Sequence, residues 1–156
     1  MNEKIIPLEL RAMTPADLPA IYELELLGED PWSKGILRDC IIVGYDCWVL
    51  MNGQALEGFA IMSLLVDECH ILNLRIRPQS QRRGYGKQLL RHLLLRGKVL
   101  GAHSAFLEVR ASNTPARMLY QQMGFQEVGL RREYYPLAVG NEREDAIILS
   151  KDLTDE

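Results

Sequence analysis

A run of glycines and basic side chains in the middle of the chain has the composition of an anion-binding turn. Residues 81–87, with the sequence QRRGYGK, follow a predicted strand and open a predicted helix. Glycine lets a ligand approach the backbone closely, and the first N–H groups of a helix attract negative charge. The spacing fits neither a Walker A loop nor a dinucleotide-binding GxGxxG loop followed by an acid. A pyrophosphate group is therefore the favoured ligand, and a plain tight turn is the alternative.

Charge along the chain is segregated in a way that supports an anion site. No Asp or Glu lies between Cys69 and Leu107, and the same stretch contains eight Lys or Arg residues. Removing these eight positive charges from the net charge of −3 leaves −11 on the remainder of the chain. A small phosphorylated ligand suits this pattern better than nucleic acid, which the acidic remainder would repel. A solvated basic helix face is the alternative.

Two further residues could move protons. Glu108 interrupts the apolar stretch 105–109, so it either faces a cleft, where a carboxylate can accept a proton, or forms a surface pair with Arg110. Tyr120 stands at helical spacing with Ala116 and its other apolar neighbours, and this spacing favours a tyrosine of the core. The pattern of residues leaves both questions open.

One further polar residue and three aromatic residues stand at positions of interest. Asn113 precedes Thr-Pro and has the features of a helix-entry residue. Trp32 and the pair Tyr134 and Tyr135 fall in predicted loops, where aromatic rings either pack or line a peptide groove.

The elements that must position these residues follow from hydrophobic periodicity. Apolar alternation predicts strands over 5–13, 45–50, 55–65, 70–77, 105–109, 125–130 and 146–149. Helical spacing predicts helices from Thr14 to a break at 28–31, after Ser33, over 84–101 and over 115–123, with an Asn-Gly hairpin turn at 51–54. A loop rich in turn formers covers 136–141. This order predicts a mixed α/β, or α+β, domain.

Composition narrows the class of protein. The chain has 156 residues, 47% of them apolar and 25% charged, which is typical of one globular domain rather than of a disordered or fibrous chain. No run of eighteen apolar residues and no secretory signal pattern is present, so we expect a soluble cytoplasmic protein with no membrane contact. Cys40, Cys47 and Cys69 lack CxxC spacing, and the three histidines lack metal-ligand spacing, so neither disulfides nor a metal are expected.

Taken together, these residues resemble the GNAT superfamily of N-acetyltransferases. Residues 81–86 match its cofactor signature, Q/R-x-x-G-x-G/A. Residues 107–113 (LEVRASN) and 119–125 (LYQQMGF) are similar to motifs of the RimI-type branch, as are PWS at 31–33 and RREYYP at 131–136. The resemblance runs from about residue 8 to residue 149.

The resemblance implies a GNAT fold with a central, mixed and mostly antiparallel sheet of six to seven strands flanked by about four helices. The whole chain, 1–156, would be one such domain, with 151–156 as a short acidic tail. The implied activity is transfer of the acetyl group of acetyl-CoA to the N-terminal α-amine of an alanine in a ribosomal small-subunit protein. Neither a metal nor nucleic acid is implied, and the oligomeric state is not predicted.

The resemblance also implies roles for individual residues. Glu108 falls at the general-base position and Tyr120, twelve residues later, at the general-acid position. Acetyl-CoA would be bound by Leu74, Arg75, Ile76, Arg82, Arg83, Gly84, Tyr85, Gly86, Lys87 and Asn113. Trp32 and Tyr134 would lie along the acceptor peptide, and the acids Glu29, Asp30, Glu133 and Glu142 would attract a basic one.

Arg75 and Arg77 depart from the family pattern, which usually has a small residue and often an acid at these positions. Contacts from their backbone to the cofactor would survive, but the direction of the two side chains is left open. Two other functions compete: a GNAT enzyme for a small amine or a lysine side chain, and a non-catalytic acyl-CoA-binding regulator. Glu108 and Tyr120 argue against the regulator, because binding alone needs neither residue.

Overall fold

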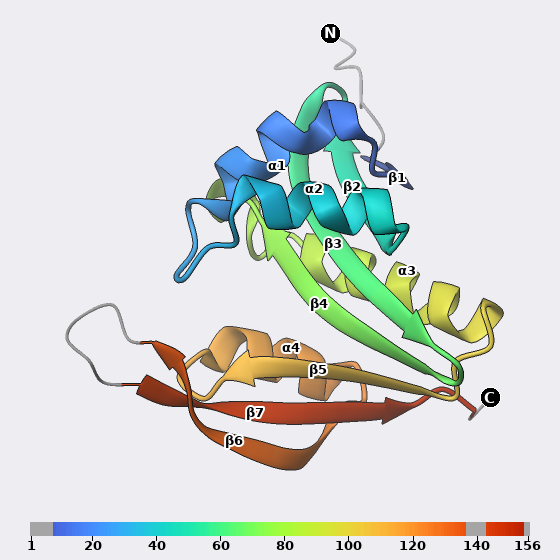
Figure 1. The fold of residues 1–156 in the computed structure, drawn as a ribbon, viewed down its shortest axis with the longest axis vertical. Helices are drawn as coiled ribbons and strands as arrows, with labels where there is room; N and C mark the ends of the chain where they lie inside the picture. The colour runs from blue at the N-terminus through green and yellow to red at the C-terminus, as the bar shows by residue number, and fades with distance from the viewer. Residues whose placement is uncertain (1–7, 137–142, 155–156) are drawn as a thin grey trace, which may run out of the picture.

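Seven strands form one sheet whose spatial order differs from the order along the chain (Figure 1). The computed structural model describes residues 8–136 and 143–154. The strands are β1 (Leu8–Ala12), β2 (Asp46–Asn52), β3 (Ala55–Leu65), β4 (Glu68–Ile76), β5 (Ser104–Arg110), β6 (Gln126–Pro136) and β7 (Arg143–Asp152). They lie in the order β1-β2-β3-β4-β5-β7-β6; β4 and β5 run parallel, and the other neighbouring pairs run antiparallel. The predicted mixed, mostly antiparallel sheet is confirmed.

Helices cover both faces of the sheet. They are α1 (Leu18–Glu25), α2 (Lys34–Val43), α3 (Tyr85–Val99) and α4 (Thr114–Gln122), with short 3-10 turns η1 (Pro15–Asp17) and η2 (Pro78–Ser80). Helices α1 and α2 pack on one apolar cluster, which contains Phe59 and Ile61 of β3. Helices α3 and α4 pack on a second cluster, which contains Ala60 and Met62 of the same strand. Successive strand residues point to opposite faces, so β3 is buried on both and its sequence is apolar almost throughout.

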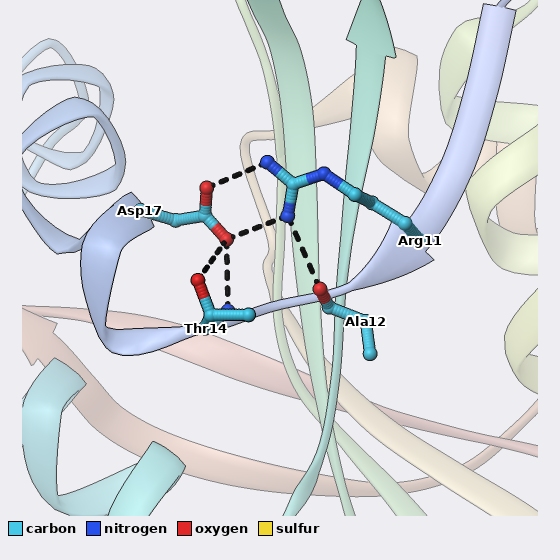
Figure 2. A network of polar contacts seen from close by, with 4 residues as sticks. All are labelled: Arg11, Ala12, Thr14 and Asp17. Atoms are coloured by element: carbon cyan, nitrogen blue, oxygen red, sulfur yellow. Dashed lines mark hydrogen bonds and ion pairs between the residues drawn. The ribbon is translucent and has the colours of Figure 1, made fainter.

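A carboxylate fixes the entry into α1 (Figure 2). Asp17 accepts hydrogen bonds from both Nη atoms of Arg11, each at 2.8 Å, and from the Thr14 N–H at 2.8 Å. The Arg11 guanidinium, with further help from Thr14, holds the pKa of Asp17 below its ordinary value against the opposing effect of burial. Because Arg11 belongs to β1, this network ties the first turn of the helical segment to the edge of the sheet.

Most predicted elements are present, and they differ mainly in their ends. The predicted strand 55–65 has the observed bounds, and the Ser33 hydroxyl caps α2 by accepting from the Ile36 N–H at 3.2 Å. Strands β6 and β7 are longer than predicted: Tyr135 and Pro136 pair with Glu144 and Arg143 as a ribbon beyond β5, and residues 150–152 of β7 pair with β5. Residues 5–7 of the first predicted strand and most of the predicted loop 136–141 lie outside the described residues.

Residues 151–153, the first part of the predicted short acidic tail 151–156, are tied to the sheet. Lys151 and Asp152 belong to β7 and pair with Ala105 and Ser104 of β5. The next residue, Leu153, is buried, and its N–H donates to the His103 carbonyl at 2.8 Å. These residues therefore complete the sheet rather than extend from it.

The sheet splits where β4 leaves β5. Their parallel pairing covers only Glu68–Ile71 opposite Ser104–Leu107, and the two strands then diverge (Figure 1). On its other edge, β4 contains one extra residue: Asn73 pairs with Ile61 and Ile71 pairs with Met62, which leaves Leu72 as a bulge. A bulge bends its strand and increases its twist, so it accounts for the divergence of β4 from β5.

Candidate active site

A cleft of about 820 Å³ opens at this divergence. Its lining comes from the α1–α2 loop, β4, the start of α3, β5, α4 and Tyr135 of β6. One side, here called the basic side, consists of Arg82, Gly84, Tyr85, Gly86 and Lys87. The other, here called the acidic side, contains the carboxylates of Glu25, Glu29, Asp30 and Glu108. The cleft therefore brings together two groups of opposite charge.

The basic side is the N-terminus of α3. Arg82 and Gly84 adopt left-handed backbone conformations, with φ of +68° and +79°, so the chain turns sharply before the helix begins. The first N–H groups of α3 then have no acceptor within the helix and face the same region as Arg82 and Lys87. A Cβ built on Gly86 would be 3.4 Å from Leu119, an ordinary contact, whereas at Gly84 the positive φ itself favours glycine. This arrangement suits a pyrophosphate.

Buried polar contacts hold the turn that leads into α3. The Ser80 hydroxyl donates a hydrogen bond to the carboxylate of Glu57, and both residues are buried. The Arg77 N–H donates to the Glu57 carbonyl at 2.8 Å, and the Arg77 Nε donates to the Leu56 carbonyl at 3.0 Å. The Arg77 side chain is thus turned toward β3, and Arg77 does not line the cleft.

The residues of β4 predicted to contact a cofactor border the cleft. Leu74, Arg75 and Ile76 all line it, beyond the end of the pairing with β5. On the opposite edge they pair with Ala60, Phe59 and Gly58 of β3. Since β4 is held on one edge only, its other edge is available to hydrogen-bond a ligand.

Glu108 lines the cleft and is paired with an arginine that the sequence did not suggest. Its Oε1 lies 2.8 Å from Nε of Arg131 on β6. The alternative drawn from the sequence, a pair with Arg110, is wrong. Arg110 instead lies 3.0 Å from a carboxylate oxygen of Glu144 and 3.6 Å from one of Glu29. Glu108 therefore has the exposure to a cleft that a general base needs.

Tyr120 is both a core residue and a cleft residue. It is only 9% exposed and its ring packs against Phe125 with centroids 5.9 Å apart, yet it also lines the cleft. Burial, assisted by the nearby Tyr135, raises the pKa of Tyr120 to about 12. The two interpretations of Tyr120 thus do not exclude each other, and its hydroxyl keeps its proton at neutral pH.

Asn113 and Trp32 both line the cleft. Asn113 caps α4: its Oδ1 accepts from the Ala116 N–H at 3.3 Å. Trp32 follows the end of α1, and its backbone N–H donates to Glu25 Oε2 at 2.8 Å. Their predicted contacts with cofactor and peptide remain predictions.

Two predicted residues do not line the cleft. Arg83 lies in the same turn as Arg82 but is absent from the lining, and Tyr135 lines the cleft where Tyr134 was predicted. The register of β6 shifts between Arg131 and Tyr135, and Glu133 has a φ of +52°. This irregularity changes which residue of the aromatic pair faces inward, and no feature of the sequence indicates it. The Arg110 guanidinium lies 4.6 Å from the centre of the Tyr135 ring.

The described residues give no sign of two other kinds of site. No three His, Cys, Asp or Glu side chains in 8–136 and 143–154 are grouped so that they could hold a metal ion. No helix in that part of the chain is both long and apolar enough to cross a membrane.

A mixed sheet that splits between β4 and β5, with a basic turn before α3, is the framework for which comparison with known proteins identifies the class. The sequence model of the Acetyltransferase (GNAT) family matches residues 11–125. The chain therefore belongs to the GNAT family of acetyltransferases, and both the predicted fold and the predicted enzyme class are confirmed.

Particular relatives within the family are similar over nearly their whole length. The [ribosomal protein bS18]-alanine N-acetyltransferase of Escherichia coli K12 is 37% identical over 142 residues, which are 90% of this chain and 95% of the relative. The N-alpha-acetyltransferase RimI of Mycobacterium tuberculosis is 37% identical over 139 residues, 83% of this chain and 85% of that one.

Solved structures agree with the fold. The crystal structure of the ribosomal-protein-S18-alanine N-acetyltransferase from Escherichia coli has a TM-score of 0.88 and 34% identity, over 96% of each chain. A GNAT family acetyltransferase from Elizabethkingia anophelis with acetyl-CoA bound has a TM-score of 0.79 at 21% identity, over 93% of this chain and 97% of that chain. The second likeness concerns the fold alone.

Proposed function

We propose that this protein transfers the acetyl group of acetyl-CoA to the α-amine of an N-terminal alanine, and that its acceptor is a ribosomal small-subunit protein. The observation that carries the proposal is that Glu108 and Tyr120 line the same cleft as the basic N-terminus of α3. The similarity to bS18-alanine N-acetyltransferases over nearly the whole chain supports the choice of acceptor.

Acetyl-CoA fits the residues of the basic side. The N–H groups at the start of α3, with Arg82 and Lys87, would bind its pyrophosphate. The open edge of β4 at Leu74, Arg75 and Ile76 would bind its pantetheine arm through backbone hydrogen bonds. An N–H near Ile76 would also stabilise the negative charge that develops on the thioester oxygen. Asn113 would contact the cofactor from the start of α4.

Glu108 would accept the proton that the amine loses. An α-amine has an ordinary pKa of about 7.7–8.0, so part of it is already neutral at pH 7. Its nitrogen forms a bond to the thioester carbonyl carbon, and Glu108 takes a proton from that nitrogen, directly or through a water molecule. The carbon–sulfur bond then breaks. No cysteine lines the cleft among the described residues, which agrees with direct transfer.

Tyr120 would act on the leaving sulfur. The pKa of about 12 keeps its hydroxyl protonated, so it can donate a hydrogen bond as negative charge develops on sulfur. A thiol has an ordinary pKa of about 8.5 and is a stronger acid than this phenol. Stabilisation of the developing thiolate by that hydrogen bond is therefore the first contribution of Tyr120. The hydroxyl proton passes to sulfur as CoA leaves, and the proton that Glu108 accepted returns through solvent to the Tyr120 oxygen.

The acidic side suits a basic acceptor. Glu29 and Asp30 line the cleft, Glu133 does not, and Glu142 lies outside the described residues. Two carboxylates beside the path of the acceptor would attract a positively charged peptide. We therefore expect preference for N-terminal segments that carry Lys or Arg after the first residue.

The test is acetyl-CoA turnover, measured as thiol release, on a basic peptide that begins with alanine. Glu108→Gln should lower kcat by about 10² to 10⁴, the usual contribution of a general base. Glu127→Gln is the matched control, since Glu127 also pairs with an arginine, Arg117 at 2.9 Å, but lies outside the cleft. The same peptide with a blocked N-terminus should not react. Turnover of small amines or internal lysines in preference to this peptide would contradict the proposal.

A further inference from the structure

The acidic side contains a buried carboxylate that the proposed chemistry does not use. Glu25, the last residue of α1, is 1% exposed. Its Oε1 accepts from Nε of Arg75 at 2.9 Å and from Nδ2 of Asn73 at 3.0 Å, and its Oε2 accepts from the Trp32 N–H at 2.8 Å. One carboxylate thus links α1, β4 and the end of the α1–α2 loop.

Arg75 reaches this carboxylate across Gly28. A Cβ built on Gly28 would lie 1.7 Å from Nη1 of Arg75, so the guanidinium rests against the loop backbone where any larger residue would displace it. The Arg75 side chain is 25% exposed, and Arg75 also lines the cleft. The sequence left the direction of the Arg75 side chain open. In the structure it lies over Gly28 of the α1–α2 loop and points to the Glu25 carboxylate.

The segment held in this way forms the wall of the acidic side. Leu27, Glu29, Asp30 and Trp32 all lie between the anchored residues and line the cleft. Asp30 has a φ of +48°, a conformation that persists when the surrounding structure holds it. The contacts of Glu25 bracket this wall: Arg75 covers Gly28 near its start, and the Trp32 N–H marks its end.

We propose that Glu25 and Arg75 are positioning residues that fix the 27–32 segment as the wall of the acceptor site. The inference rests on the proposed function, in which the acceptor peptide enters on the acidic side. It assigns to Arg75 a side-chain role that differs from the backbone contact with acetyl-CoA. The Glu25–Arg75 pair affects binding of the acceptor peptide and leaves the basic side unchanged.

Glu25→Gln is the first test. Three donors face the two carboxylate oxygens, and an amide has one oxygen, so its NH₂ group must face at least one of those donors. Hydrogen bonds from charged groups are strong, so the KM for the peptide should rise about tenfold or more. The KM for acetyl-CoA should stay within about twofold, because Glu25 contacts β4 through the side chains of Asn73 and Arg75, whereas the cofactor would bind the backbone of that strand and the basic side. Glu23→Gln is the matched control: it removes the same charge from an exposed position of the same helix.

Arg75 provides a second variant in case Glu25→Gln does not fold. Arg75→Leu removes the ion pair at a partly exposed position, and Arg75→Lys can restore a positive charge beside Glu25. We expect the peptide KM to rise with leucine and to recover in part with lysine. An unchanged peptide KM in Arg75→Leu, or an equal rise in the KM for acetyl-CoA, would overturn the proposal.

A readout that needs no turnover separates this proposal from the proposed function. The chain has two tryptophans, so Trp48→Phe leaves Trp32 as the fluorophore. In that background, Glu25→Gln or Arg75→Leu should increase acrylamide quenching of Trp32, whereas Glu23→Gln should not. If quenching increases but the parent enzyme acetylates no peptide, the proposed function fails and the positioning role stands. If the enzyme is active and quenching is unchanged, the positioning role fails.

Discussion

The basic side of the cleft is built from one stretch of chain, whereas the acidic side is assembled from three. Gly84 and its neighbours at the start of α3 follow β4 and the η2 turn, and they present backbone N–H groups beside Arg82 and Lys87. The acidic side combines Glu25 and the α1–α2 loop with Glu108 and Arg110 of β5 and Tyr135 of β6. A ligand shared by many enzymes can be bound by local backbone geometry, while an acceptor that differs between enzymes is bound by side chains from distant segments.

The two sides also differ in what holds them. A left-handed glycine and a helix N-terminus fix the basic side, and neither depends on a particular ion pair. Contacts between charged groups fix the acidic side: Glu25 with Arg75, Glu108 with Arg131, and Arg110 with its two acids. We therefore expect substitutions on the basic side to change the KM for acetyl-CoA, and substitutions on the acidic side to change the KM for the peptide.

After Glu108→Gln, the largest effect should come from Tyr120, which lines the cleft that both sides share. Tyr120→Phe removes the hydroxyl but keeps the packing against Phe125, so kcat should fall about 10² while both KM values stay nearly constant. The raised pKa has a consequence for pH. Since deprotonation of Tyr120 occurs only near pH 12, it should cause no loss of wild-type kcat between pH 8 and pH 10. An alkaline decrease centred near 10, present in wild type and absent in Tyr120→Phe, would contradict this assignment.

The next effect concerns the basic side alone. Gly84→Ala places a Cβ on a residue with φ of +79°, at a cost of about 1–2 kcal/mol, so the KM for acetyl-CoA should rise about tenfold. Gly44→Ala is the matched control, because Gly44 has a φ of +88°, a Cβ there would meet nothing within 4 Å, and the residue lies outside the cleft. Steady-state kinetics with each substrate varied in turn would measure both. An equal rise in the KM for acetyl-CoA in the two variants would show that the turn before α3 is not what binds the cofactor.

A pair of tyrosines tests the acidic side. Tyr135→Ala removes a ring that lines the cleft, and the KM for the peptide should rise about threefold to tenfold, as for the loss of one aromatic contact. Tyr134→Ala removes an exposed ring from the adjacent position and should change that KM by less than about twofold. A larger rise in the peptide KM for Tyr134→Ala than for Tyr135→Ala would mean that β6 adopts a different register when the peptide binds.

The smallest effect should come from Glu29. This side chain is 68% exposed and its pair with Arg110 is long, so Glu29→Gln should raise the KM for a basic peptide only about twofold at low salt. The difference should vanish near 1 M salt, where charges are screened beyond about 3 Å. A neutral peptide of equal length serves as the control. If both peptides respond alike, attraction of positive charge is not the role of Glu29.

The contrast between local and long-range contacts also explains which features of the fold and the site could be predicted from the sequence. The basic turn, the Asn113 cap and the strand-helix order depend on neighbouring residues, so periodicity and capping patterns predicted them. Arg131 beside Glu108 and Glu25 beside Arg75 join residues far apart in the chain, and no local pattern indicates such pairs. The inward position of Tyr135 follows from a register shift in β6, which reverses the side that simple alternation assigns.

The bulge at Leu72 has a consequence for unfolding. Because β4 leaves β5 early, only four residue pairs join β1–β4 to β5–β7 through backbone pairing. The apolar cluster under α3, which includes Ile71 and Leu107, adds further contacts between the two half-sheets. A ligand bound along the open edge of β4 adds contacts to both halves, and binding to the folded state alone raises Tm. Bound acetyl-CoA should therefore hold the two half-sheets together. Amide hydrogen exchange in β5–β7 should slow when acetyl-CoA binds.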